Sequence, residues 1–228
     1  IILNALKTNK RFFEKRSMAI FKPAHLSEKR SARRYEAIVI GGSAGSYDPI
    51  QIILSSLHQH FACPIMVVMH LNRNQDGTIA NDLNKQCKIE VKENIERKHP
   101  APGVVYFAPA NYHLLIEKDK TLALSTAPPV NFSRPSIDEL FETAAEAYGP
   151  NLMGILLSGA NSDGCRGLKK IKDRGGFSIV QDPADAKINY MPKKSLELTQ
   201  VDLVLPPKQI GFFLNKAIGV GKLLRKKV

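Results

Sequence analysis

The pentapeptide Gly41-Gly42-Ser43-Ala44-Gly45 places a serine among small residues directly after an apolar run. It fits the G-x-S-x-G pattern, in which a sharp turn between a strand and a helix lifts the serine hydroxyl clear of the sheet. The backbone N–H groups that follow then point to the place where an oxyanion would form. The pattern, between a predicted strand and a predicted helix, makes Ser43 a candidate nucleophile for acyl transfer. The alternative is a glycine-rich turn whose serine only caps the next helix.

A serine nucleophile needs a base, and His70 stands at the end of a predicted central strand. The other five histidines lie in a basic tail, near a helix end, in a polar loop or at the start of a predicted hairpin: His25, His58, His60, His99 and His113. A histidine after an apolar run is more often a structural residue than a catalyst. The proximity of Ser43 on a neighbouring strand end reverses that preference for His70.

The base in turn needs a carboxylate, and Asp163 lies in a polar loop directly after the apolar run 152–157. Taken alone, Asp163 is best explained as the N-cap of the helix that follows. In a catalytic triad it would hold His70 in the productive tautomer and stabilise the imidazolium. The chain order Ser43, His70, Asp163 differs from that of the α/β-hydrolases, where the acid precedes the histidine.

Two further groups could carry chemistry. Cys165 lies near a predicted helix N-terminus, which can lower a thiol pKa. No second histidine is placed to activate this thiol, so we expect it to pack in the core. Acidic and imidazole side chains without metal-ligand spacing occur at Glu93, Glu96, His99 and Asp119. We therefore expect neither a cofactor nor a metal.

Strands alternate with helices along the body of the chain. The apolar runs predict strands at 36–41, 64–70, 104–108, 113–117, 121–124, 152–157 and 177–180. Helical spacing predicts helices at 48–60, 76–86, 136–148, 165–173 and 193–198, with a last helix from Pro207. Ser136 stands three residues before Glu139, which is the spacing of a capping box. The order predicts an α/β fold: a doubly wound, mostly parallel sheet with helices on both faces and a short antiparallel hairpin. Such sheets bind ligands at their carboxyl edge, where Ser43, His70 and Asp163 would all lie.

Composition limits the class of protein. The chain has 228 residues, is 43% hydrophobic and contains three cysteines, which is too few for a disulfide framework. No run approaches the roughly 18 apolar residues of a membrane span, so we expect a cytoplasmic protein without membrane insertion. The net charge of +12 comes from the ends: residues 1–35 carry +8 and residues 216–228 carry +5. We expect residues 1–35 to be a flexible basic tail and residues 36–228 to be one catalytic domain with a basic end.

The body resembles the catalytic domain of the chemotaxis protein-glutamate methylesterases, the CheB family. The resemblance covers about residues 36–214 and lies in these segments: IVIGGSAGS at 38–46, VVMHL at 67–71, PGVVYFAPANYHLL at 102–115, RPSIDELFETAA at 134–145, GILLSGANSDGCRGL at 154–168 and GGFSIVQDPADAKINYMP at 175–192. It implies a triad of Ser43, His70 and Asp163, with backbone support for the oxyanion at Ala44 and Ala160. It also implies hydrolysis of glutamyl γ-methyl esters on chemoreceptor helices through an acyl-enzyme, and deamidation of receptor glutamines by the same chemistry.

The chain departs from the family pattern at several places. Ser46 and Met69 stand where the family has glycine and, often, glutamine, and the loop around Ala160 is usually richer in glycine and asparagine. A basic segment of 35 residues at the start is too short to form the receiver domain that family members commonly carry. The chain would then be a fragment or a stand-alone esterase under other control, such as a regulatory receiver protein acting in trans.

Three rival functions stay open at this point. The first is a serine esterase or amidase that acts on another protein or a small ester. The second is a non-catalytic binding module in which the altered aspartate loop no longer aligns His70. The third is a nucleic-acid binder that uses the basic ends, although neither end combines stacking aromatics with a reading motif, and we expect no DNA or RNA partner.

Overall fold

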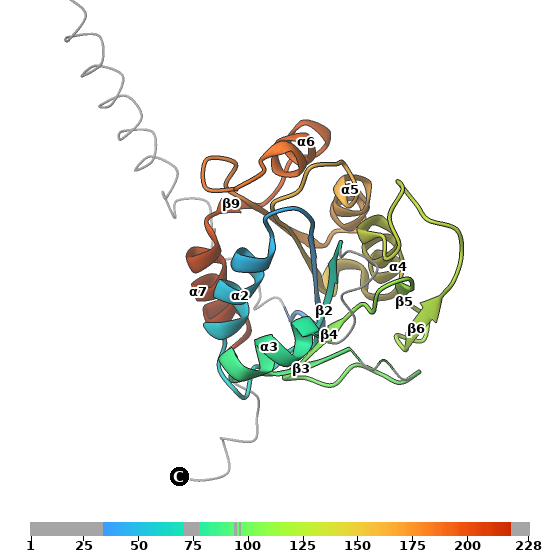
Figure 1. The fold of residues 1–228 in the computed structure, drawn as a ribbon, viewed down its shortest axis with the longest axis vertical. Coiled ribbons are helices and arrows are strands. Elements are labelled where there is room, and N and C mark those ends of the chain that lie inside the picture. The colour runs from blue at the N-terminus through green and yellow to red at the C-terminus, as the bar shows by residue number, and fades with distance from the viewer. Residues whose placement is uncertain (1–33, 71–77, 94, 96, 220–228) are drawn as a thin grey trace, which may run out of the picture. The chain divides into compact units, whose positions relative to one another are not determined.

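Seven strands of the described chain form one parallel sheet with β1 at its centre (Figure 1). The computed structural model describes residues 34–70, 78–93, 95 and 97–219. The strands are β1 (Ala37–Gly42), β2 (Ile65–Met69), β3 (Glu90–Lys92), β4 (Val104–Phe107), β7 (Leu152–Leu156), β8 (Phe177–Gln181) and β9 (Leu203–Leu205). Their order is β3-β4-β2-β1-β7-β8-β9, and every neighbouring pair is parallel. Strand β1 therefore lies between β2 and β7, which brings the ends of these three strands together.

Helices cover both faces of the sheet (Figure 1). One face packs against α2 (Tyr47–Ser55), α3 (Thr78–Gln86) and α7 (Pro207–Ile218). The other face packs against α4 (Ile137–Tyr148), α5 (Cys165–Asp173) and α6 (Tyr190–Leu198). A two-stranded antiparallel hairpin, β5 (His113–Ile116) and β6 (Leu122–Ser125), joins the second face beside α4, and a short 3₁₀ turn at Gly149–Asn151 leads into β7.

The apolar runs become strands because both of their faces are buried. In β1, Ile38 and Ile40 belong to one core, whereas Ala37 and Val39 belong to the other. A strand that alternates between two apolar cores reads as a continuous apolar run and shows no polar alternation. This pattern made the central strands predictable.

The predicted fold class is confirmed: the sheet is mostly parallel, helices lie on both faces and one short antiparallel hairpin is present. Strands β3 and β9 did not appear among the predicted elements. Each has three residues at an edge of the sheet and is only partly buried, so neither gives a continuous apolar run. Helix α2 ends at Ser55, before the predicted limit of residue 60, and α6 begins three residues earlier than predicted.

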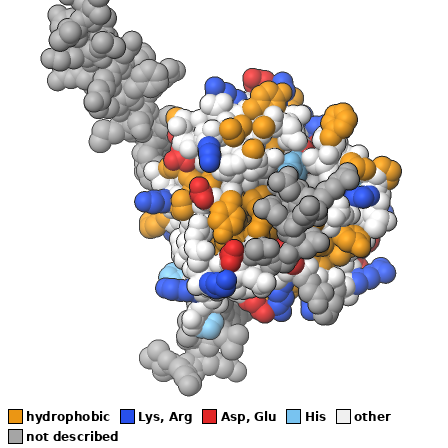
Figure 2. Space-filling model, in the orientation of Figure 1, with side chains coloured by type: hydrophobic (Ala, Val, Ile, Leu, Met, Phe, Trp, Pro, Cys, Tyr) orange, Lys and Arg blue, Asp and Glu red, His pale blue; other side chains and the backbone are white. Residues whose placement is uncertain are grey.

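The basic ends of the chain lie almost entirely outside the described residues. Only Arg34 and Tyr35 of the predicted tail, and the residues up to Gly219 of the predicted basic end, are described. On the face in Figure 2, lysine and arginine side chains are interspersed with acidic ones around hydrophobic patches. This mixed surface agrees with the nearly neutral net charge of residues 36–215. Across the described ranges, none of the helices combines the length and apolarity needed to cross a membrane.

Candidate active site

Three loops at the carboxyl edge of the sheet carry the predicted site residues. Ser43 follows β1, His70 follows β2 and Asp163 lies between β7 and α5. Backbone pairing continues past the strand ends: the His70 N–H donates to the Gly42 carbonyl at 3.1 Å, and the Ser43 N–H donates to the Ser158 carbonyl at 2.9 Å. Main-chain bonds therefore join His70 to the end of β1, and Ser43 to the loop that contains Asp163, before any side chain is considered.

The turn after β1 is held by a second serine and needs a glycine. The buried Ser46 hydroxyl donates to the Ser43 carbonyl at 2.6 Å, and the Ser46 N–H donates to the same oxygen at 3.0 Å. Gly45 has a φ of +78°, a left-handed conformation that residues with a Cβ adopt only with strain. Ser46, where the family has glycine, thus tightens the turn that presents the Ser43 hydroxyl.

His70 connects the serine to the aspartate. Its Nδ1 lies 3.0 Å from Ser43 Oγ, and its Nε2 lies 2.7 Å from Asp163 Oδ2. The carboxylate can only accept, so the ring proton is assigned to Nε2 and the Nδ1 lone pair faces the serine hydroxyl. The His70 side chain is 14% exposed, whereas that of Asp163 is 0% exposed. The imidazole can therefore take a proton from Ser43 while its other nitrogen stays bound to a buried carboxylate.

The Asp163 carboxylate has four further donors. Oδ2 also accepts from the Ile137 N–H at 2.7 Å. Oδ1 accepts from Ser136 Oγ at 2.8 Å, from the Asp138 N–H at 3.2 Å and from Asn131 Nδ2 at 3.2 Å. Burial raises the pKa of Asp163, but the bonds from His70, Ile137 and Ser136 outweigh burial, and the net pKa is lowered. Asp163 therefore carries the negative charge that an imidazolium at His70 would need.

The backbone groups predicted to support an oxyanion lie beside the serine. The Ala44 carbonyl accepts from Ser158 Oγ at 2.8 Å, which fixes the peptide between Ala44 and Gly45. Ala160 follows Gly159, where an added Cβ would lie 3.1 Å from Ser43 Cβ. Among the described residues, neither the Ala44 nor the Ala160 N–H donates to another protein group. The role of both N–H groups in catalysis stays a prediction.

Several residues around the triad carried no functional signal in the sequence. Asn131 and Asp138 contact the Asp163 loop from a segment about 30 residues earlier in the chain, and no local pattern reveals that contact. The capping box gave a partial signal, because Ser136 Oγ accepts from the Glu139 N–H at 3.4 Å and also donates to Asp163. His113 is buried, accepts from the Ser136 N–H and faces the Pro128 carbonyl, so it is a structural histidine.

The thiol near this site is a poor nucleophile. Cys165 is fully buried, and burial, followed by the nearby charges of Asp138 and Asp163, raises its pKa to about 12. Its Sγ lies 3.6 Å from the Met191 carbonyl. Within the ranges that the structure describes, no group of three or more His, Cys, Asp or Glu side chains could hold a metal ion.

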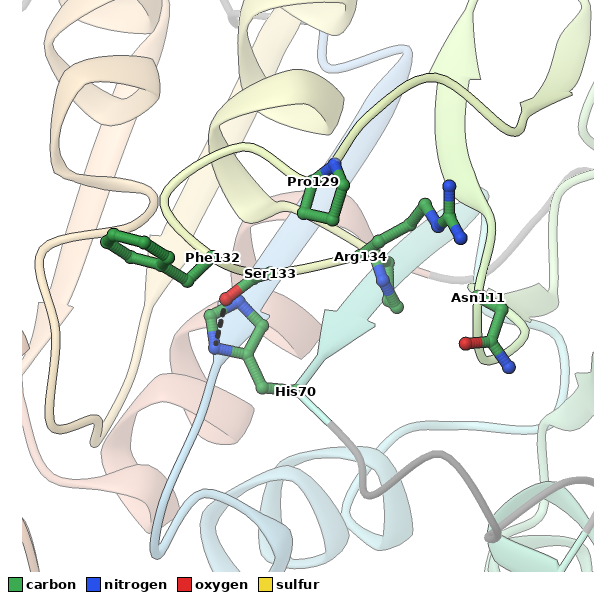
Figure 3. A pocket seen from close by; sticks show the side chains of 7 residues that line it. His70, Asn111, Pro129, Phe132, Ser133 and Arg134 are labelled. Carbon is green, nitrogen blue, oxygen red and sulfur yellow. Dashed lines mark hydrogen bonds between the residues drawn. The ribbon is translucent and has the colours of Figure 1, made fainter.

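A pocket of about 140 Å³ opens beside His70 (Figure 3). It is lined by His70, Asn111, Pro129, Phe132, Ser133, Arg134 and Pro135. Most of these residues belong to the segment 126–135, which connects β6 to α4 and which we call the arch. Ser133 Oγ in the arch lies 3.5 Å from His70 Nδ1, so the pocket reaches the reactive nitrogen.

The fold and this chain of contacts are typical of serine hydrolases. The CheB methylesterase family model matches residues 38–214. The chain is 52% identical over 177 residues to a Leptospira interrogans protein provisionally named protein-glutamate methylesterase/protein-glutamine glutaminase, covering 78% of this chain and 92% of that one. It is 34% identical to protein-glutamate methylesterase/protein-glutamine glutaminase 5 of Geobacter metallireducens, covering 83% of this chain and 54% of that one. It thus spans about half the length of the Geobacter relative.

A comparison with a solved structure gives the same family. The catalytic domain of Thermotoga maritima CheB methylesterase superposes with a TM-score of 0.76 at 30% identity, covering 80% of this chain and 98% of that one. The chain belongs to the CheB methylesterase family and is a carboxylic-ester hydrolase.

Proposed function

We propose that this protein hydrolyses the γ-methyl esters of glutamate side chains on chemoreceptors, in the adaptation step of chemotaxis. The observation that carries the proposal is the hydrogen-bond chain from Ser43 Oγ through His70 to Asp163, with distances of 3.0 Å and 2.7 Å. The names of the relatives supply the substrate class, a methyl-esterified protein glutamate. A pocket of about 140 Å³ opens beside His70 and offers room next to the base.

In the first half-reaction, Ser43 Oγ attacks the ester carbonyl while His70 Nδ1 takes the hydroxyl proton. The carbonyl oxygen of the ester becomes an oxyanion, which the N–H groups of Ala44 and Ala160 would bind. Asp163 continues to accept the hydrogen bond from His70 Nε2 and stabilises the imidazolium without being protonated itself. The tetrahedral intermediate then collapses, and His70 gives its proton to the methoxide oxygen. Methanol departs, and the glutamyl group stays esterified to Ser43.

In the second half-reaction, His70 Nδ1 takes a proton from water, and the hydroxide attacks the acyl carbon. The intermediate expels the Ser43 alkoxide, which recovers the proton from His70, and the product is a free glutamate side chain. A glutamine side chain would follow the same route with ammonia as the leaving group, which gives deamidation. No step needs a cofactor.

The remaining parts of the proposal concern organisation. Residues 36–228 would form the catalytic domain, preceded by a flexible basic tail at residues 1–35. Receptor segments that carry many carboxylates would meet this basic tail faster at low salt. The protein would act in the cytoplasm, with a receiver protein in trans as a candidate regulator.

The experiment is release of methanol from a methyl-esterified chemoreceptor fragment by the parent and by Ser43→Ala. We expect the variant to lose at least about 10³-fold in kcat, because no other group can form the acyl-enzyme. Ser55→Ala, at an exposed serine at the end of α2, is the matched control and should behave as the parent. Equal release by the parent and Ser43→Ala would remove Ser43 from the mechanism.

A further inference from the structure

Phe132 stands at the tip of the arch with its side chain in solvent. Its exposed fraction is 104%, the highest of the large hydrophobic residues among those described. Its φ is +62°, and that of Asn131 is +48°, so two consecutive residues with side chains adopt the left-handed region. Large side chains rarely adopt this conformation, and strained backbone of this kind concentrates at functional sites.

Hydrogen bonds from the residues around Phe132 hold this strained backbone conformation. Asn131 Nδ2 donates to Asp163 Oδ1 at 3.2 Å and to Asp138 Oδ2 at 3.0 Å. Val130 and Ser133 exchange two main-chain bonds across the tip, at 3.1 Å and 2.8 Å. These contacts tie the tip to the same carboxylate that orients His70. The backbone that carries the Phe132 ring is therefore fixed relative to the reacting atoms.

That place is at the mouth of the site. Ser133, the next residue, has its Oγ 3.5 Å from His70 Nδ1, which in turn lies 3.0 Å from Ser43 Oγ. Figure 3 shows the Phe132 ring turned away from His70, on the outer side of the arch. The ring therefore lies beside the site, where residues that flank an inserted side chain can reach it.

The opposite border of the site is also partly apolar. The Ile188 carbonyl accepts from the Gly159 N–H, and the Ile188 N–H donates to Ser158 Oγ, which places the segment 187–190 beside the Ser43 turn. Ile188 and Tyr190 are 36% and 52% exposed. The arch and the partly apolar segment 187–190 both lie near the Ser43 turn.

We propose that Phe132 determines specificity for protein substrates: its ring packs against an apolar side chain next to the esterified glutamate in the substrate chain. The inference rests on the proposed function and names the feature by which a protein ester is preferred over a small one. An exposed aromatic ring with a fixed backbone offers apolar area on binding at little cost in conformational entropy. The ring contacts the segment that flanks the ester and leaves the reacting atoms to the triad.

The test compares two probes: a methyl-esterified chemoreceptor fragment, and the γ-methyl ester of an N-acetylated glutamate amide. Phe132→Ala and Phe132→Gly remove the ring, whereas Phe132→Leu keeps an apolar side chain. For the fragment, we expect Phe132→Ala and Phe132→Gly to raise KM roughly ten-fold, with kcat within about two-fold of the parent. Phe132→Leu should fall between them and the parent. The small ester should show a much smaller change in kcat/KM, because it has no flanking segment.

Phe132→Gly distinguishes the effect of losing the ring from the effect of the left-handed backbone conformation. Glycine adopts a φ of +62° without strain, so Phe132→Gly should be at least as resistant to thermal unfolding as Phe132→Ala. If the left-handed backbone alone mattered, Phe132→Gly would match the parent on the fragment, and the proposal would be wrong. The matched control is Phe212→Ala in α7, where another phenylalanine is 71% exposed; its KM should not change.

Other outcomes also overturn the inference. Equal losses on the fragment and the small ester would mean that the variants disturb the triad, and parent-like kinetics for all Phe132 variants would mean that the ring binds nothing. Ser43→Ala, assayed in parallel, distinguishes the two proposals. If Ser43 is required and the Phe132 variants match the parent, only the specificity inference fails; if Ser43→Ala is active, both fail.

Discussion

The N-termini of α4 and α5 are capped by carboxylates that each helix supplies to the other. Asp163, just before α5, accepts from the N–H groups of Ile137 and Asp138 at the start of α4. Asp138, in the first turn of α4, accepts from the N–H groups of Gly164 and Gly167 at the start of α5, at 2.9 Å and 2.8 Å. Both carboxylates are essentially buried. Their local surroundings are therefore closely matched, which makes their differences informative.

The two carboxylates differ in their remaining partners and in the direction of their pKa shifts. Asp163 faces the nearly buried His70, and its net pKa is lowered. Asp138 faces Arg166, which is 64% exposed, and burial together with the charge of Asp163 raises its pKa. Of two neighbouring carboxylates, the one with more donors holds the charge more tightly. Both carboxylates cap a helix, so the contact with the His70 imidazole is what distinguishes Asp163 from Asp138.

The largest effect should come from Asp163→Asn, which keeps the shape and removes the charge. If the amide nitrogen faces His70, the ring must present the Nε2 lone pair, and Nδ1 then carries a proton toward Ser43. If the amide is turned, its nitrogen meets the Ser136 hydroxyl and the Asp138 N–H. We expect methanol release to fall by about 10³- to 10⁴-fold because His70 cannot act as a base in the wrong tautomer.

The control for this variant is Asp173→Asn, at an exposed aspartate in the last turn of α5 whose partner is Lys169 of the same helix. It should retain the parent's activity. If Asp163→Asn lost no more than about ten-fold while remaining folded, Asp163 would be a helix cap only, and the contrast with Asp138 would disappear.

Asp138→Asn should affect stability more than activity. Its amide nitrogen would face Arg166 and Asn131, both of which are donors, so we expect a loss of about 1–3 kcal/mol in the free energy of unfolding. Activity should fall by about ten-fold at most, because no bond to Asp163 uses the Asp138 carboxylate. A loss of activity as large as that of Asp163→Asn, in a folded protein, would contradict this separation of roles.

The pH dependence of the two stability losses should have opposite signs. The pKa of Asp163 is lowered, so its charge stabilises the fold above its ordinary value near 3.8, and this stabilisation is lost as pH falls through the folded pKa. The pKa of Asp138 is raised, so its contribution is largest below 3.8 and declines as pH rises through the folded pKa. The penalty of Asp163→Asn should therefore grow with pH, and that of Asp138→Asn should shrink. Urea denaturation between about pH 3 and about pH 6 measures both, and parallel slopes would contradict the assignment.

The sequence could predict the central sheet because its strands are buried on both faces and leave continuous apolar runs. It could also predict Ser43 and His70 as neighbours, since the turn pattern and the strand ends place them at one edge. The edge strands β3 and β9 were not predictable in this way, because three partly buried residues give no periodicity. The expected fold therefore had the right centre and incomplete edges.

The support of Asp163 could not be read from local pattern. Asn131 and Asp138 reach it only because α4 and α5 pack side by side, and their polar residues are compatible with any helix start or loop. The exposure of Phe132 was equally unpredictable, since a phenylalanine in a loop sequence would ordinarily be expected to find a core. Tertiary contacts decide both cases.

The smallest effect should come from Cys165→Ala, at the first residue of α5. A helix N-terminus can activate a thiol, but here the Asp138 carboxylate takes the free N–H groups and adds a negative charge beside the sulfur. We expect kcat/KM for the methyl ester within about two-fold of the parent and a stability loss of about 1 kcal/mol from the lost packing. In the native parent, iodoacetamide should label the half-buried Cys87 well before the fully buried Cys165. If Cys165→Ala lost most of its activity while remaining folded, the thiol would have a part in the chemistry. The Asp138 carboxylate at the start of α5 could then no longer be regarded as a structural cap alone.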